Sequence, residues 1–487
     1  MKKINSLLCS LMIALAGFSV MACSEEEQAH EHNFTISAFD DIHHWKKCNC
    51  GEVDLSSYEK HHNESNTDTH WFSCDCGVSN EKKSHEWILT ETLDRARYQY
   101  DGLGIYSCSA CTEKKEDIIP APEPKTLEEL GALKKLSEEE INAYGINKSS
   151  IPQRLDGAEY YTFGVYPQTV LAQKDFDEGN IKILDIECAE SGITYKMGDD
   201  CNWYVEVPGY EVGYFSCKYS DGTFTNENIR YFKAEPLVWR KLTDKNVDGK
   251  NCVMLVSEKA VDFCIGKLAK DKKRNIDGSD IHNNNYKHSI TRAFLNGLSY
   301  EGFEFFPDIW DTEQITVHEY ENNGFLQKAF TLEQSKRIVE YEVDNSPESA
   351  DFNIPIGNTT KYFKYPDEFY CENTRDKIFL LSLKEATSKD LGFISSRSSC
   401  PLLARKATDF GIYKRKSMPY SLNNEVINIV DWPLRTPISY SSDDQDGWGI
   451  AGARFYDQYG RFYSIIDFSS VYEASIVPAL VVEESLN

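Results

Sequence analysis

The sequence predicts an α+β protein in which small metal-stabilised repeats precede a large mixed domain of short strands and few helices. Eight of the eleven histidines lie between His30 and His85, so the N-terminal part differs in composition from the rest. Prolines alternate over residues 120–124, which favours an extended spacer. Beyond residue 155, short apolar or alternating runs are separated by Gly, Asn and Asp, as in a strand-rich domain.

The first 22 residues have the composition of a signal peptide. Lys2 and Lys3 precede an apolar run that is shorter than the about 20 residues needed to span a bilayer. Residues 20–23 resemble a lipobox, which implies that Cys23 takes up diacylglycerol and becomes the mature N-terminus. Ordinary cleavage with an unmodified Cys23 is the alternative. The acidic residues 24–27 resemble surface-export tags of some Gram-negative lipoproteins.

The balance of charge limits the partners of the protein. The chain carries 52 Lys and Arg against 78 Asp and Glu, a formal net charge of −26. Such a field repels polyphosphate, so we expect no nucleic-acid partner and no adhesion to anionic lipid heads. Because no second apolar stretch of about 18 residues follows the first, the lipid is expected to be the only membrane anchor.

Histidine and cysteine recur with the same spacing in two segments. His44-Trp45 precedes a Cys-x-Cys-Gly sequence and a later histidine, and His70-Trp71 does the same. A third segment has Tyr106 in place of the histidine-tryptophan pair and no later histidine, so it would cap the array or draw ligands from elsewhere, such as His85. The candidate metal ligands are His44, Cys48, Cys50, His61, His70, Cys74, Cys76, His85, Cys108 and Cys111.

Each of the first two segments offers two thiols and two imidazoles, enough for one tetrahedral zinc site. A unit of about 25 residues cannot bury a sufficient core, so zinc would supply folding energy and act structurally. Disulfides are the competing interpretation, since an oxidising compartment permits them. The segments resemble the zinc-ribbon-like repeats in front of many secreted bacterial domains, although their Cys-x-x-Cys is shortened here to Cys-x-Cys.

The linker and the downstream domain have local signals of their own. Thr126 with Glu129 and Ser137 with Glu140 form capping-box patterns that predict two short helices. Strands are expected at 160–165, 252–257, 378–383 and 475–482, and helices at 289–298 and 331–340. The expected organisation is a signal peptide at 1–22, the tether and repeats at 23–118, the linker and two helices at 119–154, and the α+β domain at 155–487.

The downstream domain resembles an uncharacterised family of bacterial extracytoplasmic domains over residues 155–484. The ordered motifs include Phe163-Gly164-x-Tyr166-Pro167, Pro236 to Arg240, Ser289-x-x-Arg292, and Trp432-Pro433-Leu434-Arg435-Thr436-Pro437. The family is similar to C-type-lectin-like and sulfatase-modifying-factor folds. The resemblance therefore implies a lectin-like domain.

A few side chains of this domain are candidate ligand contacts. Trp432, Arg435 and Trp448 would suit a sugar or a carboxylate. The structural alternative is core packing of the tryptophans and buried ion pairs of Arg292 and Arg435 with Asp376 or Asp409. The acidic, glycine-containing stretch 441–449 suits calcium, with a solvated turn as the alternative.

The sequence favours a non-catalytic surface protein that binds glycan or protein over an enzyme acting on polysaccharide or on protein side chains. It contains no Gly-x-Ser-x-Gly elbow, phosphate loop or His-Glu-x-x-His motif. We expect a lipid anchor in the cell envelope, at the outer membrane or cell surface rather than the cytoplasmic membrane.

Overall fold

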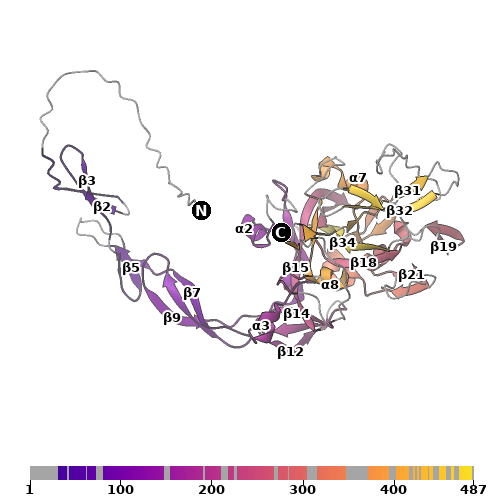
Figure 1. Ribbon diagram of the computed structural model, residues 1–487, viewed down its shortest axis with the longest axis horizontal. Helices are drawn as coiled ribbons and strands as arrows, with labels where there is room; N and C mark the ends of the chain where they lie inside the picture. Colours follow the sequence, from indigo (N-terminus) through magenta and orange to yellow (C-terminus); the bar gives the residue numbers. More distant parts are fainter. Residues whose placement is uncertain are drawn as a thin grey trace, which may run out of the picture. The chain divides into compact units, whose positions relative to one another are not determined.

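A computed structural model of the chain divides into two compact units (Figure 1). Unit 1 comprises residues up to Asp94 together with Leu103–Ile118, and unit 2 comprises Arg95–Gly102 and Ile119–Asn487. The structure describes residues 31–40, 43–61, 63–72, 81–146, 154–189, 192–209, 218–223, 228–267, 273–282, 285–303, 315–346, 371–393, 402–415, 421–422, 425–426, 429–430, 432–436, 438–441, 449–456, 462–465 and 471–484.

Unit 1 contains three small modules, each a three-stranded antiparallel sheet with strands in sequence order. The first module is formed by β1 (Ile36–Phe39), β2 (His43–Lys47) and β3 (Val53–Lys60). The second is formed by β4 (Asn63–Ser65), β5 (Thr69–Phe72) and β6 (Lys83–Ser84). The third is formed by β7 (Trp87–Asp94), β8 (Gly102–Cys108) and β9 (Lys114–Ile119).

The modules bury very little apolar surface. The side chains of Phe39, Leu55 and Ile88 are 54, 82 and 53% exposed, although each lies in a strand. Among the described residues of unit 1, the buried ones include Cys48, His61 and Cys108. Groups able to ligate a metal therefore occupy the positions that aliphatic side chains take in an ordinary small domain.

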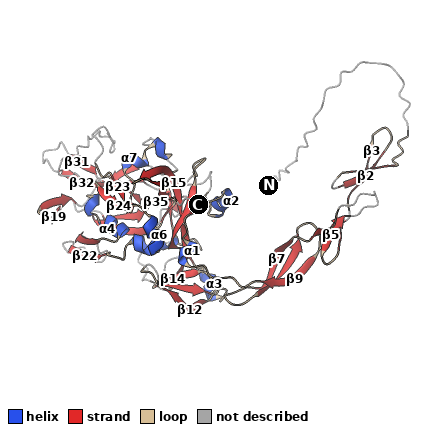
Figure 2. Cartoon of the chain, turned by 180° about the vertical axis from the view of Figure 1, so that it is seen from behind, coloured by secondary structure: helices blue, strands red, loops and turns tan. Residues whose placement is uncertain are grey.

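Unit 2 is built on a nine-stranded sheet (Figure 2). Its path is β12 (Ile183–Cys188), β13 (Tyr195–Gly198), β14 (Trp203–Val207), β15 (Arg230–Val247), β16 (Lys250–Ser257), β35 (Ala479–Glu483) and β25 (Ile378–Phe379). β11 (Tyr160–Val170) pairs with β15, and β10 (Lys134–Lys135) pairs with β11. Asp248 and Gly249 connect β15 to β16 with positive φ angles of 52° and 82°, as a tight hairpin requires.

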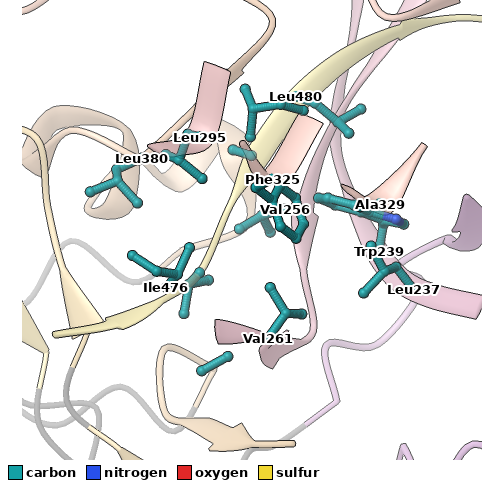
Figure 3. Close-up of a cluster of buried hydrophobic side chains, with 14 of the residues drawn as sticks. Leu237, Trp239, Val256, Val261, Leu295, Phe325, Ala329, Leu380, Ile476 and Leu480 are labelled. Carbon is teal, nitrogen blue, oxygen red and sulfur yellow. The ribbon is translucent and has the colours of Figure 1, made fainter. Parts of the chain in front are cut away.

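The core of unit 2 lies against this sheet (Figure 3). Trp239 of β15, Val256 of β16 and Leu480 of β35 are fully buried. Short helices cover the cluster, with Leu295 from α4 and Phe325 from α5. The Trp239 indole N–H donates to the Phe163 carbonyl at 2.8 Å, so the largest core side chain also has its polar atom satisfied.

The helices of the described residues are short. They are α1 (Leu127–Leu130), α2 (Glu138–Ala143), α3 (Gln173–Asp177), α4 (Ile290–Asn296), α5 (Phe325–Ala329), α6 (Leu332–Arg337), α7 (Leu383–Ala386) and α8 (Asp409–Arg415). Both predicted capping boxes, at Thr126 and Ser137, are present, and Ser289 caps α4. None of these helices is long and apolar enough to cross a membrane.

Shorter pairings complete unit 2. They are β17 (Lys259–Ala260) with β26 (Arg405–Ala407) and β29 (Ile429–Val430); β18 (Asp262–Lys267) with β34 (Val471–Ile476); β19 (Lys273–Ile276) with β20 (Ser279–His282); β21 (Ser299–Phe303) with β22 (Ile315–Glu319); β23 (Tyr341–Val343) with β24 (Thr374–Asp376); β27 (Ser421–Leu422) with β28 (Glu425–Val426); and β32 (Gly449–Tyr456) with β30 (Trp432–Pro433), β31 (Ile438–Ser441) and β33 (Phe462–Ile465). The described residues are thus mostly strand with few helices, which agrees with a mixed, sheet-rich fold.

The strand expected at 160–165 continues to Val170, and three further predicted elements end early or are divided. The strand expected at 378–383 ends at Phe379, because Ser382 caps α7. The strand expected at 475–482 is split, because the backbone leaves β34 after Ile476 and enters β35 only after Pro478. The helix expected at 331–340 ends at Arg337, because buried Ile338 is extended and bridges to Val482.

Candidate metal centre

Two imidazoles and two thiols of unit 1 converge at one place. His70, His85, Cys108 and Cys111 each offer a ligand atom, and these atoms all lie within 4.8 Å of one another. The Cys108 Sγ lies 3.7 Å from His70 Nδ1, and the Cys111 Sγ lies 3.4 Å from His85 Nδ1. This group could hold a metal ion.

Strand pairing brings these four residues together from two modules. His70 lies in β5 of the second module, and His85 lies between β6 and β7. Cys108 ends β8 of the third module, and Cys111 follows in the turn before β9. A metal ion held by the four would therefore connect the second module to the third.

The distances suit tetrahedral zinc. Zn–S bonds of about 2.3 Å and Zn–N bonds of about 2.05 Å place neighbouring sulfur and nitrogen ligands about 3.6 Å apart. The two sulfur–nitrogen distances of 3.7 and 3.4 Å fall on either side of this value. Two thiolates with two imidazoles also form a ligand set typical of structural zinc.

The surroundings act in opposite directions on the two thiols of this group. Burial raises the pKa of the Cys108 thiol, but hydrogen bonds from the Ala110 backbone N–H, from His85 and from Cys111 outweigh burial and lower that pKa to about 6. Burial raises the pKa of Cys111. His85 Nε2 lies 2.7 Å from the Asn66 carbonyl, which fixes the ring with Nδ1 toward the sulfur.

A second group lies in the first module. His32, Cys48 and Cys50 have ligand atoms within 4.8 Å of one another, and Cys50 Sγ lies 3.3 Å from His32 Nδ1. Gly51 follows with a φ of 98°, and its N–H donates to the Cys48 carbonyl at 2.9 Å. The glycine permits the tight turn that brings both sulfurs to one side.

The grouping differs from the sequence-based expectation of one site within each repeat. Among the described residues, Cys48 and Cys50 are grouped with His32, and His44 and His61 are not part of that group. The sequence-based alternative that Cys108 and Cys111 draw on His85 agrees with the structure. Cys74, Cys76 and the lipidation candidate Cys23 lie outside the described residues.

His32 is the metal-ligand candidate that sequence reasoning missed. It has no tryptophan after it, so the repeat pattern did not select it. A different signal marks it, because His32 precedes β1 much as His61 precedes β4 and His85 precedes β7. The position just before the first strand of a module therefore indicates a metal-ligand candidate.

Two of the candidate ligand contacts of unit 2, Trp432 and Arg435, lie in the core. Trp432 is 0% exposed, and its indole N–H donates to the Leu403 carbonyl at 2.8 Å. Arg435 is 3% exposed and pairs with Glu385 at 2.6 Å. Their burial favours the structural alternative. The partner of Arg435 is Glu385, whereas Arg292 pairs with Asp376 as expected, at 2.8 Å. Trp448 and the possible calcium loop, from residue 442 to 448, lie outside the described residues.

Unit 2 also contains a pocket of about 80 Å³. Tyr144, Ile146 and Val238 form part of its wall, and Glu258, Lys259 and Lys406 also line it. One oxygen of the buried Glu258 carboxylate has no hydrogen-bond partner among the described residues. Lys259 and Lys406 are paired across the parallel strands β17 and β26. The pocket thus combines an apolar wall with charges of both signs.

Comparison with known proteins gives one match. Residues 250–483 match a family described as a domain of unknown function (DUF6273). The match begins at the first residue of β16 and ends at the last residue of β35, so it leaves out β10 to β15, which belong to the same sheet. No curated protein and no solved structure matches the chain.

Proposed function

We propose that the protein is a lipid-anchored envelope protein whose unit 1 is a zinc-stabilised stalk and whose unit 2 binds a glycan or protein ligand without catalysis. The convergence of His70, His85, Cys108 and Cys111 carries the proposal. Four protein ligands leave no open coordination position, so the metal is structural rather than catalytic. The apolar exposure of the modules explains why a metal is needed.

Metal analysis tests the stalk. The purified full chain should contain at least one zinc ion per molecule that is lost in the double variant Cys108→Ser/Cys111→Ser. The matched control is Cys201→Ser/Cys252→Ser, which removes two buried thiols of unit 2 and should leave the zinc content unchanged. A chain without bound metal, or with Cys108 and Cys111 oxidised to a disulfide, would reject the zinc stalk.

Residues 1–23 support the lipid anchor and the envelope location. The apolar run ends at Ala22-Cys23, and the acidic residues 24–27 follow. Cys23→Ser should move the protein from the membrane fraction to the soluble fraction, because acyl chains provide the anchor in this proposal. Persistent membrane association of the variant would argue for another attachment.

The pocket of unit 2 supports a ligand with hydrogen-bond donors and a negatively charged group. A donor on the ligand would satisfy the buried oxygen of Glu258, and an anionic group would pair with Lys259 or Lys406. A glycan array probed with the full chain should give signals that weaken at least about tenfold in Lys259→Ala/Lys406→Ala. The exposed pair Lys336→Ala/Glu333→Ala, away from the pocket lining, is the control.

A further inference from the structure

We infer that the pocket of unit 2 selects a carboxylated sugar, with Glu258 accepting a sugar hydroxyl at the buried end and Lys259 and Lys406 binding the carboxylate. The inference rests on the ligand binding proposed for unit 2 and names the class of that ligand. Buried arginines beside Glu258 are the reason why it takes a neutral hydroxyl and not an amine.

The pocket and a group of buried charged side chains lie on one face of the sheet. Arg240 of β15 is the direct antiparallel partner of Tyr160 in β11, and Val238, two residues before Arg240, lies on the same face. Val238 is part of the pocket wall, and its carbonyl accepts from the Glu258 N–H at 2.9 Å. The wall of the pocket therefore adjoins the surroundings of Tyr160.

Three charged groups act on the Tyr160 hydroxyl. Burial and the Glu258 carboxylate raise the pKa of Tyr160 to about 12, whereas Arg240 and Arg405 act to lower it. Glu258 is 7% exposed, and each of the two arginines is 1% exposed. Two buried guanidinium groups thus offset the charge of one buried carboxylate. A cation bound to Glu258 would add to an excess of positive charge that water does not screen.

Glu258 lacks a hydrogen-bond donor and not a counter-charge. Its Oε2 atom is buried and has no hydrogen-bond partner among the described residues. Such an acceptor is costly to leave unsatisfied, so it normally binds water or a ligand group. Because the charge of Glu258 is already offset, the donor that suits it is neutral. A sugar hydroxyl donates a hydrogen bond without adding charge.

The other lining residues favour an anion on a ring. Lys259 and Lys406 are paired across β17 and β26. The charged groups that line the pocket or act on Tyr160 comprise four basic side chains and two acidic ones, Glu235 and Glu258, in a chain of net charge −26. Tyr144 is 39% exposed and offers an aromatic wall to the C–H groups of a sugar ring. A hexuronate carries a carboxylate and hydroxyls on one such ring.

Binding of small ligands to the full chain, measured by titration and nuclear magnetic resonance, tests this selection. The hexuronates glucuronate, galacturonate and mannuronate supply both groups. Glucose lacks the carboxylate, cyclohexanecarboxylate lacks the hydroxyls, glucosamine supplies a cation, and N-acetylglycinate supplies an amide N–H in place of the hydroxyl. At least one hexuronate should bind about tenfold more tightly than each of these four compounds.

Charge substitutions connect the preference to this pocket. Lys406→Glu, at an exposed lysine, should weaken hexuronate binding at least about tenfold and leave the affinity for glucose unchanged. Lys336→Glu, at an exposed lysine outside the pocket lining, is the matched control and should alter neither affinity. Arg240→Met removes one group that offsets Glu258, so it should shift the preference from hexuronate toward glucosamine. If this buried substitution prevents folding, Lys406→Glu alone decides.

The outcomes separate this inference from ligand binding itself. Equal binding of cyclohexanecarboxylate or N-acetylglycinate would show that Glu258 receives no sugar hydroxyl, and preferred binding of glucosamine would show that it takes a cation. Either result overturns the inference, as does a hexuronate preference that Lys406→Glu leaves intact. If Lys259→Ala/Lys406→Ala weakens array signals that come only from neutral or amino sugars, the ligand binding proposed for unit 2 stands and this inference fails.

Discussion

Single buried residues of unit 2 show what the motifs of the downstream domain do. Arg292, three residues after the helix-capping Ser289, pairs with Asp376 of β24 at 2.8 Å. Arg435, three residues after Trp432, reaches Glu385 and the Leu380 carbonyl. Both arginines join segments that are distant in sequence. The ordered motifs therefore specify core connections. Arginine and tryptophan suit both a buried core and a ligand site, so the sequence alone does not distinguish the two roles.

Asp376→Asn should destabilise unit 2 strongly. The Asp376 side chain is 1% exposed, and its carboxylate accepts from Arg292 and from the Thr374 hydroxyl. Removing one charge from a buried pair leaves the other uncompensated, which costs about 3 to 5 kcal/mol. Urea unfolding followed by fluorescence of the buried tryptophans measures this loss. Glu333→Gln, in an exposed pair with Lys336, should cost less than about 1 kcal/mol. Equal midpoints for the two variants would contradict the prediction.

At the metal groups, the residue types were predictable from sequence but their grouping was not. Cysteine and histidine at repeated spacings indicate ligands whatever the fold. Which histidine meets which cysteine depends on how three-stranded modules follow one another, and the repeat spacing contains no information on that. His85 is 26 residues from Cys111 yet lies 3.4 Å from its sulfur, whereas His44, only four residues from Cys48, is not in its group.

At the scale of elements, local chemistry predicted helix starts better than strand ends. Capping boxes at Thr126 and Ser137 involve residues three apart, so the sequence contains the whole interaction. Strand ends depend on distant partners. Ile338 is not helical because it bridges to Val482. The sequence at 331–340 contains no local signal that predicts this contact.

The edge where β10, β11 and β15 meet should lose stability in acid. Lys135 of β10 and Lys241 of β15 both pair with Glu159, and these ion pairs lower the Glu159 pKa from 4.5 to about 2. The stabilisation is therefore complete above the unfolded-state pKa of 4.5 and is lost as pH falls toward 2. Because Glu159 is 34% exposed, its contribution is only about 1 kcal/mol.

Glu159→Gln tests this edge. The variant should unfold at lower urea concentration than the parent at pH 7, and the difference should shrink as pH falls below 4.5. Unfolding midpoints between pH 7 and 3 provide the measurement. A difference that is constant over this range would mean that the carboxylate charge does not stabilise the edge, and that the side chain acts only through packing.

At the scale of the whole molecule, the two units obtain their stability from different sources. Unit 2 has a continuous apolar core that spans β11 to β35 and the short helices on it. Unit 1 exposes Leu55, Ile88 and other strand side chains and buries cysteines and a histidine instead. Hydrophobic burial can therefore maintain unit 2, whereas the modules, in the function proposed above, would depend on bonds to a metal.

Removal of the metal should consequently affect the two units unequally. After treatment of the full chain with a zinc chelator, amide hydrogen exchange should become fast in β5, β7 and β8, because the bonds that connect their modules are lost. Exchange in β15, β16 and β35 should remain slow, because their protection comes from buried apolar contacts. Addition of zinc should restore protection in unit 1. Protection of β7 and β8 that survives chelation would show that the modules fold without metal, and would remove the physical reason for the clustered histidines and cysteines.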